Sequence, residues 1–547
     1  MYKIVIDKMS VIHHPTLLLL CILVFNMCVC QSQHEKSVRR LSPPYPFSFN
    51  ISQISGSAVT FGPEGSENDG KFYRTLALLD DKLFIGGNMS LFSARTQDLQ
   101  TLDHVSILNQ SDGWSCDEKY CNNFIRVIQP LSDSVLLECG TNSFKPYCQQ
   151  RSSQNLSTIG SPQKGSFIAP SVPHQNSSWL LINDPASGYQ IFAGSNLGNS
   201  LSGKMSQLGI VKANLEVTQT ETRIDNVLTT KKHMDYVLNS PQFVGDPIEY
   251  NGSIYFFFRE FSAEHINAGK IVYSRVARIC KSEAGGDDYM SFENNFVTFM
   301  KARLECSIAG DHPYHYNEIQ DIYQSTKDKN VVFAIFATGP SGVASSALCA
   351  YRLDEMELLF EHSPFKAQVS GDVQNLWLRV RRRDSDNILR TRRTCPAQTS
   401  FSTNLYLELL LFAQLLDSPV KNKLRYKSKG SKDANPLLIL SGERFSQIVV
   451  DEDVNSFDVF FIGTENGTVL EAYLGKRESE ARIVQEISLN TNGVKKPVLT
   501  MLKSNSDQAV FVGTDVGVYK VPFQHCQDYT SAYACWNPYC NWINALA

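Results

Sequence analysis

Short apolar runs recur along most of the chain, each followed by glycine and a polar stretch. The pattern occurs in LFIGGNMSLF (Leu83–Phe92), VLLECGTNSF (Val135–Phe144), QIFAGSN (Gln190–Asn196), DVFFIGTENGTVLEAYL (Asp458–Leu474) and AVFVGTDVGVYKVPF (Ala509–Phe523). Short runs rich in Val, Ile, Phe and Tyr predict strands. We interpret the glycines as turn residues, because glycine adopts the backbone angles that tight hairpins need. The chain is therefore predicted to be a series of β-hairpins.

Strand–turn–strand units spread over residues 45–522 favour an all-β fold, a β-propeller, in which radial repetition leaves few exposed sheet edges. Seven blades would take about 68 residues each, more than the ~40–45 of a compact blade, so insertions are required. The periodicity alone leaves the blade number open. Residues 352–430 are the expected insertion, because helical periodicity and charge runs replace the strand pattern there. Within it, Leu407–Leu416 (LELLLFAQLL) is predicted to be a packed helix.

Composition supports a folded chain without a strong charge preference. Apolar residues make up 42% of the 547 residues and charged residues 19%, with 51 Lys and Arg against 55 Asp and Glu. Such a chain can form a large core. The net charge of −4 argues against a general nucleic-acid binder.

The N-terminus resembles a secretory signal peptide. Lys3 and Lys8 precede an apolar stretch at Leu17–Phe25, with small residues near Cys30. An uncleaved anchor is the alternative, although the stretch is shorter than the ~20 residues of a membrane span. We expect a signal peptide at residues 1–30, a flexible lead-in at 31–44, and a secreted, extracellular product with no membrane span in the mature chain.

Sequons and cysteines agree with export. N-x-S/T sequons, candidates for N-glycosylation, occur at Asn50, Asn88, Asn109, Asn155, Asn176, Asn251 and Asn466. Eleven of the 14 cysteines lie after the predicted signal peptide, with short-range pairs and a C-terminal group. Exported cysteines usually form disulfides, which we favour over zinc because two CxxC knuckles do not occur.

Sequence signals for catalysis are weak. Gly198–Met205 imitates a P-loop, but Met205 replaces the hydroxyl residue that would hold Mg²⁺. His312 and His315 lack a third metal ligand nearby, and acidic groups such as Asp287–Asp288 and Asp451–Asp453 are expected to be solvated turns. GxSxG and HExxH motifs are absent. We therefore expect neither an enzyme nor a cofactor or metal site.

Several longer motifs resemble the sema domain of the semaphorins. They are CNNFIRV (121–127), CGTNSFKPYC (139–148), QFVGDP (242–247), IYFFFRE (254–260), VYSRVARICK (272–281), KARLECS (301–307), NEIQDIY (317–323) and RFSQIVVD (444–451). They occur in the family's order across residues 45–525. Plexins and Met-type receptors also carry sema domains, but YFFFRE and CGTN resemble the semaphorins.

The resemblance implies a seven-bladed β-propeller and four disulfides. The implied pairs are Cys116–Cys121, Cys139–Cys148, Cys280–Cys395 and Cys306–Cys349; free buried thiols are the alternative. Residues 526–547, with Cys526, Cys535 and Cys540, resemble a shortened PSI module, the small cysteine-rich domain that follows the propeller in this family. Three cysteines cannot all pair internally, which leaves one for an intermolecular bond or a free thiol.

An arginine-rich run precedes Cys395. It contains Arg379, Arg381, Arg382, Arg383, Arg390, Arg392 and Arg393, and 379–382 and 390–393 match the R-x-[KR]-R pattern that secretory proprotein convertases cleave. A solvated surface, binding of sulfated glycans and cleavage are the three interpretations. Lysines and an arginine also alternate over 421–432.

Semaphorin resemblance implies a secreted signalling ligand that binds a plexin-family receptor through its sema domain and guides cell migration or axon growth. Family members act as homodimers, and two linked ligands can hold two receptors together. The shortened C-terminus motivates an alternative, a monomeric decoy that occupies plexin without clustering it. A secreted enzyme on a propeller scaffold is the alternative from another class.

Overall fold

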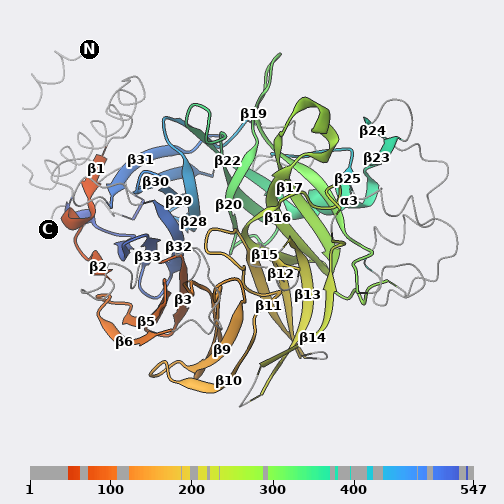
Figure 1. The fold of residues 1–547 in the computed structure, drawn as a ribbon. Helices are drawn as coiled ribbons and strands as arrows, with labels where there is room; N and C mark the ends of the chain where they lie inside the picture. The colour runs from red at the N-terminus through yellow and green to blue at the C-terminus, as the bar shows by residue number, and fades with distance from the viewer. Residues whose placement is uncertain are drawn as a thin grey trace, which may run out of the picture.

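The computed structural model describes residues 47–61, 72–107, 122–185, 188–197, 207–218, 222–232, 234–286, 294–369, 376–379, 395, 415–422, 435–476, 478–489, 497–528 and 538–539. Strands dominate this part of the chain, as predicted, and it contains one α-helix, α3 (Leu353–His362). The strands form seven sheets, which we number in chain order. Figure 1 shows them arranged around a common centre.

The first three sheets each contain four consecutive strands. Sheet 1 has β3 (Thr75–Leu79), β4 (Lys82–Gly86), β5 (Ser90–Arg95) and β6 (Thr101–Ser106); sheet 2 has β7 (Ile125–Ser132), β8 (Val135–Gly140), β9 (Tyr147–Ser152) and β10 (Thr158–Lys164); sheet 3 has β11 (Ser178–Asp184), β12 (Gly188–Asn196), β13 (Leu208–Val217) and β14 (Thr222–Thr229).

The next two sheets both involve the predicted insertion: its strands extend sheet 4, and it precedes the last strand of sheet 5 in the chain. Sheet 4 has β15 (Gln242–Tyr250), β16 (Ser253–Phe261), β17 (Val272–Cys280) and β18 (Met300–Ile308), extended by β19 (Tyr314–Tyr316), β23 (Phe365–Val369), β24 (Leu376–Arg379), β25 (Leu415–Leu416) and β26 (Val420–Lys421); sheet 5 has β20 (Glu318–Gln324), β21 (Val331–Ala337), β22 (Ser345–Arg352) and β27 (Leu438–Ser441).

The last two sheets take their outer strands from the N-terminal segment. Sheet 6 has β28 (Phe445–Val454), β29 (Phe457–Thr464), β30 (Thr468–Gly475), β31 (Arg482–Ser488) and β1 (Phe47–Asn50); sheet 7 has β32 (Val498–Ser504), β33 (Ala509–Thr514), β34 (Gly517–Pro522) and β2 (Ala58–Phe61). β1 pairs parallel to β31, and β2 pairs antiparallel to β34. Short 3-10 helices lie at Ile51–Gln53, Ala263–Ala268 and Cys526–Asp528.

Seven apolar clusters hold the sheets together, one between each consecutive pair. The last of them joins Phe511 and Val518 of sheet 7 to Leu83 and Ile85 of sheet 1, so that the series of contacts returns to its start. Middle strands are buried on both faces, as in β21 (VVFAIFA), whereas the outer strand β6 is largely exposed. This gradient follows from packing sheet on sheet, which buries both faces of every middle strand.

The recurring glycine has a different role from the one predicted for it. In the hairpin β29–β30 the turn glycine is Gly467, with φ +79°, but Gly463 lies inside β29. A β-carbon at Gly86 would lie 2.7 Å from Ile125, and one at Gly463 would lie 2.5 Å from Val498, each on the next sheet. Gly194 likewise faces Phe243. The repeated glycine therefore permits close approach between neighbouring sheets, and the prediction of a turn residue at these positions was wrong.

The predicted insertion contributes both helix and strand. Helix α3 buries Met356 and Phe360 against sheets 4 and 5, whereas β23, β24 and β25 extend sheet 4. The predicted helix at 407–416 is wrong at its end, because Leu415–Leu416 is a short strand paired with β18 and β23. Residues 407–414 lie outside the described residues.

Three of the proposed disulfides are present. Cys139–Cys148, with an S–S distance of 2.04 Å, joins directly paired positions of β8 and β9. Cys280–Cys395 (2.06 Å) connects the end of β17 to a residue 115 positions later, and Cys306–Cys349 (2.11 Å) ties β18 of sheet 4 to β22 of sheet 5. Cys116 and Cys121 lie outside the described residues.

The described part of the C-terminal segment packs on sheet 6. The Tyr539 hydroxyl donates to Asp451 at 2.7 Å, and its ring stacks on Phe523. Cys526 is disulfide-bonded, whereas Cys535 and Cys540 lie outside the described residues. The Ser55 backbone N–H donates to Asp528 at 2.8 Å, so the N-terminal segment and the C-terminal segment meet here.

Candidate functional site

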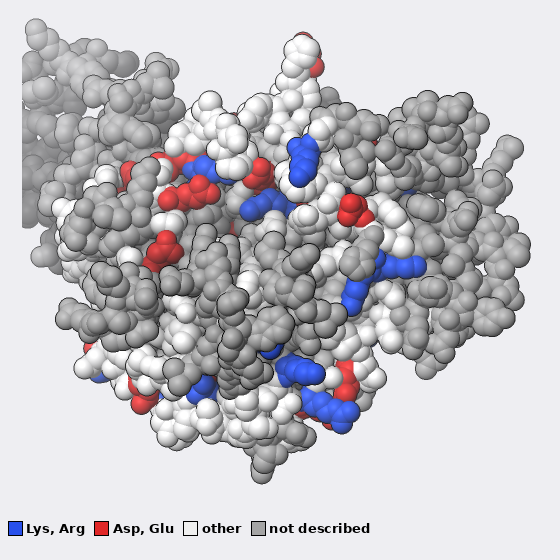
Figure 2. Space-filling model, in the orientation of Figure 1, with Lys and Arg blue, Asp and Glu red and all other residues white. Residues whose placement is uncertain are grey.

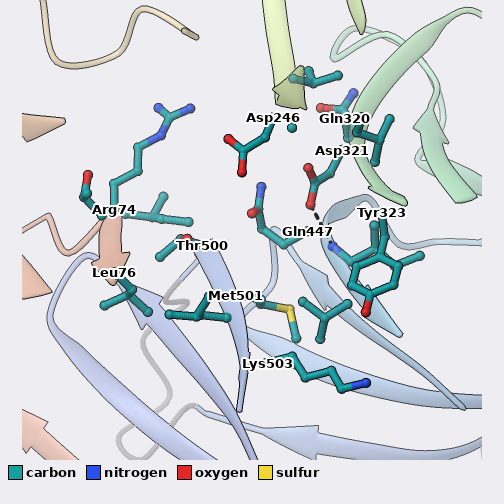
Figure 3. Close-up of a pocket in the computed structure, with 18 of the residues that line it drawn as sticks. Arg74, Leu76, Asp246, Gln320, Asp321, Tyr323, Gln447, Thr500, Met501 and Lys503 are labelled. Atoms are coloured by element: carbon teal, nitrogen blue, oxygen red, sulfur yellow. Dashed lines mark hydrogen bonds between the residues drawn. The ribbon is translucent and has the colours of Figure 1, made fainter. Parts of the chain in front are cut away.

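A cavity of about 510 Å³ lies where the first strands of all seven sheets converge, and we call it the axial cavity. Its lining comes from β3, β7, β11, β15, β20, β28 and β32 and the residues next to them. Figure 3 shows Arg74 on one side of this cavity and Asp246 and Asp321 on the other. Pockets of roughly 300–1,000 Å³ are typical of small-molecule sites.

β-Bulges redirect the lining side chains. The register shifts between Ile125 and Val127, between Val244 and Ile248, and between Ile319 and Asp321. Similar shifts occur near the starts of β28 and β32. A bulge adds an unpaired residue and bends its strand, and bulges are common beside binding sites. Here the bulges place Arg126, Asp246 and Gln320 in the cavity lining.

Two arginines form the basic side of the axial cavity. Arg74 Nη2 donates to Asn176 Oδ1 at 2.5 Å, and Arg126 Nη1 donates to the carbonyl oxygens of Pro173 (2.5 Å) and Gln175 (3.1 Å). Burial, followed by the charge of Arg259, lowers the pKa of Arg74 to about 10. Burial and the charge of Arg74 also lower the pKa of Arg126. Both guanidinium groups therefore lie in positive, partly dehydrated surroundings.

Two carboxylates form the opposite, acidic side. Asp321 is 8% exposed and accepts a hydrogen bond from the Ile448 backbone N–H at 3.0 Å. Burial raises the pKa of Asp321 to about 7. Asp246 is exposed to the cavity and follows Gly245, whose φ of +57° and closeness to Ile322 favour glycine. The acidic side thus holds one enclosed and one accessible carboxyl group.

The enclosed carboxyl group predicts a pH-dependent stability. The folded-state pKa of Asp321, about 7, exceeds the ~3.9 of an unfolded aspartate, so between these values the folded chain binds a proton that the unfolded chain lacks. The free energy of unfolding should therefore fall as pH rises from about 4 through 7. Asp321→Asn should remove up to about 4 kcal/mol of this loss over the whole interval, of which about 2 kcal/mol should appear between pH 5.5 and 8, measured by urea unfolding at these two values.

Glu471 and Asp246 also have pKa values raised by loss of hydration, to about 7 and about 6, so the wild-type protein alone does not isolate Asp321. The difference between Asp321→Asn and wild type is therefore the readout. Asp98→Asn, at an exposed aspartate paired with Arg95, is the control and should leave the pH dependence unchanged. Equal pH slopes for wild type and Asp321→Asn would contradict the assignment.

Of the predicted arginine run, only Arg379 lies within the described residues. It ends β24, its side chain is 68% exposed, and its Nε lies 3.8 Å from Asp417. Arg381, Arg382, Arg383, Arg390, Arg392 and Arg393 lie outside the described residues. The structure therefore places the start of the run on an exposed edge strand of sheet 4.

The sequon asparagines differ in accessibility. Asn155 and Asn251 are exposed, and Asn50, Asn176 and Asn466 are half-buried. Asn88 is 8% exposed, which argues against a glycan there, because the modified nitrogen must reach solvent. Asn109 lies outside the described residues.

The acidic group Asp451–Asp453 was wrongly predicted to be a solvated turn. It belongs to β28, where Glu452 is buried and accepts hydrogen bonds from Ser325, Thr326 and the Lys327 backbone N–H. His315 Nδ1 contacts Glu305 at 3.1 Å. Among the described residues, no group of three or more His, Cys, Asp or Glu side chains could hold a metal ion.

Acidic and basic side chains are interspersed on the molecular face in Figure 2, where they are drawn for the described residues. Over the part of the chain with a described structure, no helix is long and apolar enough to cross a membrane.

The axial cavity is not predicted by the sequence pattern. Arg126, Asp246 and Gln320 lie within motifs that served only as fold markers, and they are far apart in the sequence. The one local signal was polar residues at or beside strand starts, where a buried strand would be apolar.

Comparison with known proteins places these features in a family context. Residues 319–505 match the Sema domain family. The chain is 29% identical over 478 residues to Semaphorin 5c of Drosophila melanogaster; the match covers 84% of this chain but only 40% of that protein.

Solved structures of semaphorins are also similar to this chain. Drosophila Semaphorin 2a has a TM-score of 0.76 and 25% identity, covering 92% of this chain and 80% of that one. A chain in the structure of Drosophila Plexin A in complex with Semaphorin 1b has a TM-score of 0.68 and 25% identity, covering 88% of this chain and 89% of that one. In sequence and in fold, the chain is therefore similar to semaphorins.

Proposed function

We propose that this chain is a semaphorin and acts as a ligand for a plexin receptor. The observation that carries the proposal is its similarity, over 88% of its length, to a chain in a complex of Plexin A with Semaphorin 1b. The order of the sema-like motifs and the three disulfides agree with it. A signalling ligand of this kind guides cell migration or axon growth and is not an enzyme.

The proposal includes a closed, seven-bladed β-propeller over residues 45–525. It is supported by seven sheets, by apolar clusters between all consecutive pairs, and by a cavity lined from all seven. N-terminal strands supply the outermost strands of sheets 6 and 7, so that the two ends of the chain pair in the same sheets. A PSI-like module at 526–547 is proposed on the cysteines and on the packing of Tyr539.

Extracellular location is the second part of the proposal. We include in it a signal peptide at residues 1–30, a flexible lead-in at residues 31–44, and glycans at the accessible sequons. The disulfides agree with an oxidising compartment, because such bonds are rare in the cytosol. The arginine run 379–393 is proposed as a solvated surface, a site for sulfated glycans or a convertase cleavage site, and gel analysis under reducing conditions separates the last from the first two.

Binding to plexin ectodomains tests the function. We expect the full chain, secreted from cultured cells and immobilised, to bind at least one plexin ectodomain from a panel in a surface plasmon resonance experiment. The same protein after reduction and alkylation is the control and should lose binding, because its loops are no longer tied. Binding to none of the plexins would leave the similarity as one of fold only.

Oligomeric state separates agonist from decoy. A dimer in multi-angle light scattering favours an agonist that holds two receptors together. A monomer that binds plexin and blocks a second semaphorin favours the decoy.

A further inference from the structure

The basic side of the axial cavity holds two guanidinium groups without an acidic partner. Among the described residues, Arg74 and Arg126 form no ion pair; their bonded partners are one amide oxygen and two backbone carbonyls. Arg126 is only 7% exposed. Its Nε and Nη2 make no hydrogen bond within the described structure and are not among its enclosed unpaired atoms. These donors are therefore available to a molecule in the cavity.

The acidic side of the cavity holds a carboxylate that likewise has no ion-pair partner among the described residues. Asp246 forms no ion pair or hydrogen bond with the described residues, although its side chain is open to the cavity. Figure 3 shows it across the cavity from Arg74. Its neighbour Asp321 already accepts a bond from Ile448 and is enclosed, so Asp246 is the accessible acceptor.

Opposite charges that face each other across a cavity without meeting are costly to keep. A buried or half-buried charge is normally paired or hydrogen-bonded, because it has lost part of its hydration. Arg151 with Glu138 and Arg275 with Glu260 show buried opposite charges that meet in an ion pair, which the two sides of this cavity do not. A molecule with charges of both signs would satisfy both sides at once.

We propose that the axial cavity binds a small dipolar molecule, whose carboxylate contacts Arg74 and Arg126 and whose ammonium group contacts Asp246. The volume of about 510 Å³ suits a single small ligand. A dianion such as sulfate fits less well, because Asp246 and Asp321 would repel it. The proposal goes beyond receptor binding and does not depend on it.

Calorimetric titration of the full-length wild-type protein provides the first test. The probes are glycine, β-alanine, 4-aminobutyrate and 5-aminovalerate, which hold the two charges at increasing separations, with butyrate and butylammonium as singly charged controls. One amino acid of the series should bind at least about tenfold more tightly than either control, because each charge-assisted hydrogen bond contributes roughly a tenfold factor or more. If no member of the series binds more tightly than butyrate, the proposal is overturned without any variant.

Variants locate the binding. Asp246→Asn is isosteric, and Arg74→Gln replaces the guanidinium group by a shorter neutral amide. Both alter groups that are not fully buried, and each should weaken the best amino acid by about tenfold or more. Arg352→Gln is the matched control, because Arg352 pairs with Asp354 outside the cavity; it should leave binding unchanged. Equal weakening by Arg352→Gln, or full binding by both cavity variants, would contradict the assignment. Thermal unfolding of each variant verifies that it is folded.

Discussion

Glu260→Gln should lower the free energy of unfolding by about 3–5 kcal/mol, the loss typical when one partner of a buried ion pair is removed. Glu260 Oε1 accepts from Arg275 Nε at 3.0 Å and from Lys301 Nζ at 2.5 Å, and Oε2 accepts from the Asn239 backbone N–H. The side chains of all three charged partners are at most 1% exposed. Glutamine would leave the two cations with a single carboxylate, Glu264.

Charge balance explains why this site is sensitive. The cluster contains two acids, Glu260 and Glu264, and two bases, Arg275 and Lys301. Burial lowers the pKa of Lys301, a change that Glu260 opposes by its charge. Without Glu260 the lysine should lose its proton or attract water, and either change weakens the packing of sheet 4.

A double-variant cycle measures the effect with urea unfolding followed by fluorescence. Glu260→Gln combined with Lys301→Met restores the balance of charge and should be less destabilised than Glu260→Gln alone. Glu478→Gln, which breaks an exposed pair with Arg482, is the control and should cost no more than about 0.5 kcal/mol. Equal losses for the buried and exposed variants would refute the assigned role of the cluster.

Removing the Cys280–Cys395 bond should cost about 5 kcal/mol of unfolding free energy. The bond closes a loop with a sequence separation of 115. In the chain-entropy model, closing a loop of this length lowers the conformational entropy of the unfolded chain and stabilises the folded state by about 5 kcal/mol. Cys280→Ala combined with Cys395→Ala removes both thiols, because a buried free thiol could form a wrong disulfide. Urea unfolding of the double variant under non-reducing conditions is the measurement.

The short Cys139–Cys148 loop is the internal control. Its separation is 9, so the same model gives about 2.5 kcal/mol for Cys139→Ala combined with Cys148→Ala. The chain-entropy model attributes the difference between the two bonds to loop length alone. A larger loss for the short loop than for the long one would show that native packing, rather than chain entropy, controls the effect.

The sequence predicted the local elements well because their determinants are local. The hairpins at 458–474 and 509–523 form as expected, since alternating β-branched and aromatic residues favour strands. In the first hairpin, Gly467 permits the turn between its two strands. The helix α3 lies where helical periodicity replaced the strand pattern. The prediction failed at Leu415–Leu416, because pairing with β18 and β23 overrides local helical preference.

Positions with a non-local role were misinterpreted. Gly86, Gly194 and Gly463 were assigned to turns, although what they permit is the approach of a neighbouring sheet. Glu452 was assigned to a solvated turn, although it receives hydrogen bonds from a segment more than a hundred residues earlier. Sequence pattern reports which face of an element is apolar, but not which distant element lies against that face.

Amino-acid sequence by itself determined the strand-rich class, the hairpin units, the sema-like motifs and the cysteines available for bonding. Tertiary structure alone decided that an apolar cluster joins the last sheet to the first, that bulges aim Arg126 and Asp246 into one cavity, and that Glu260 pairs with two bases. The physical reason is that burial, charge pairing and close approach depend on distances between residues remote in the chain, whereas strand and turn preferences depend on neighbours.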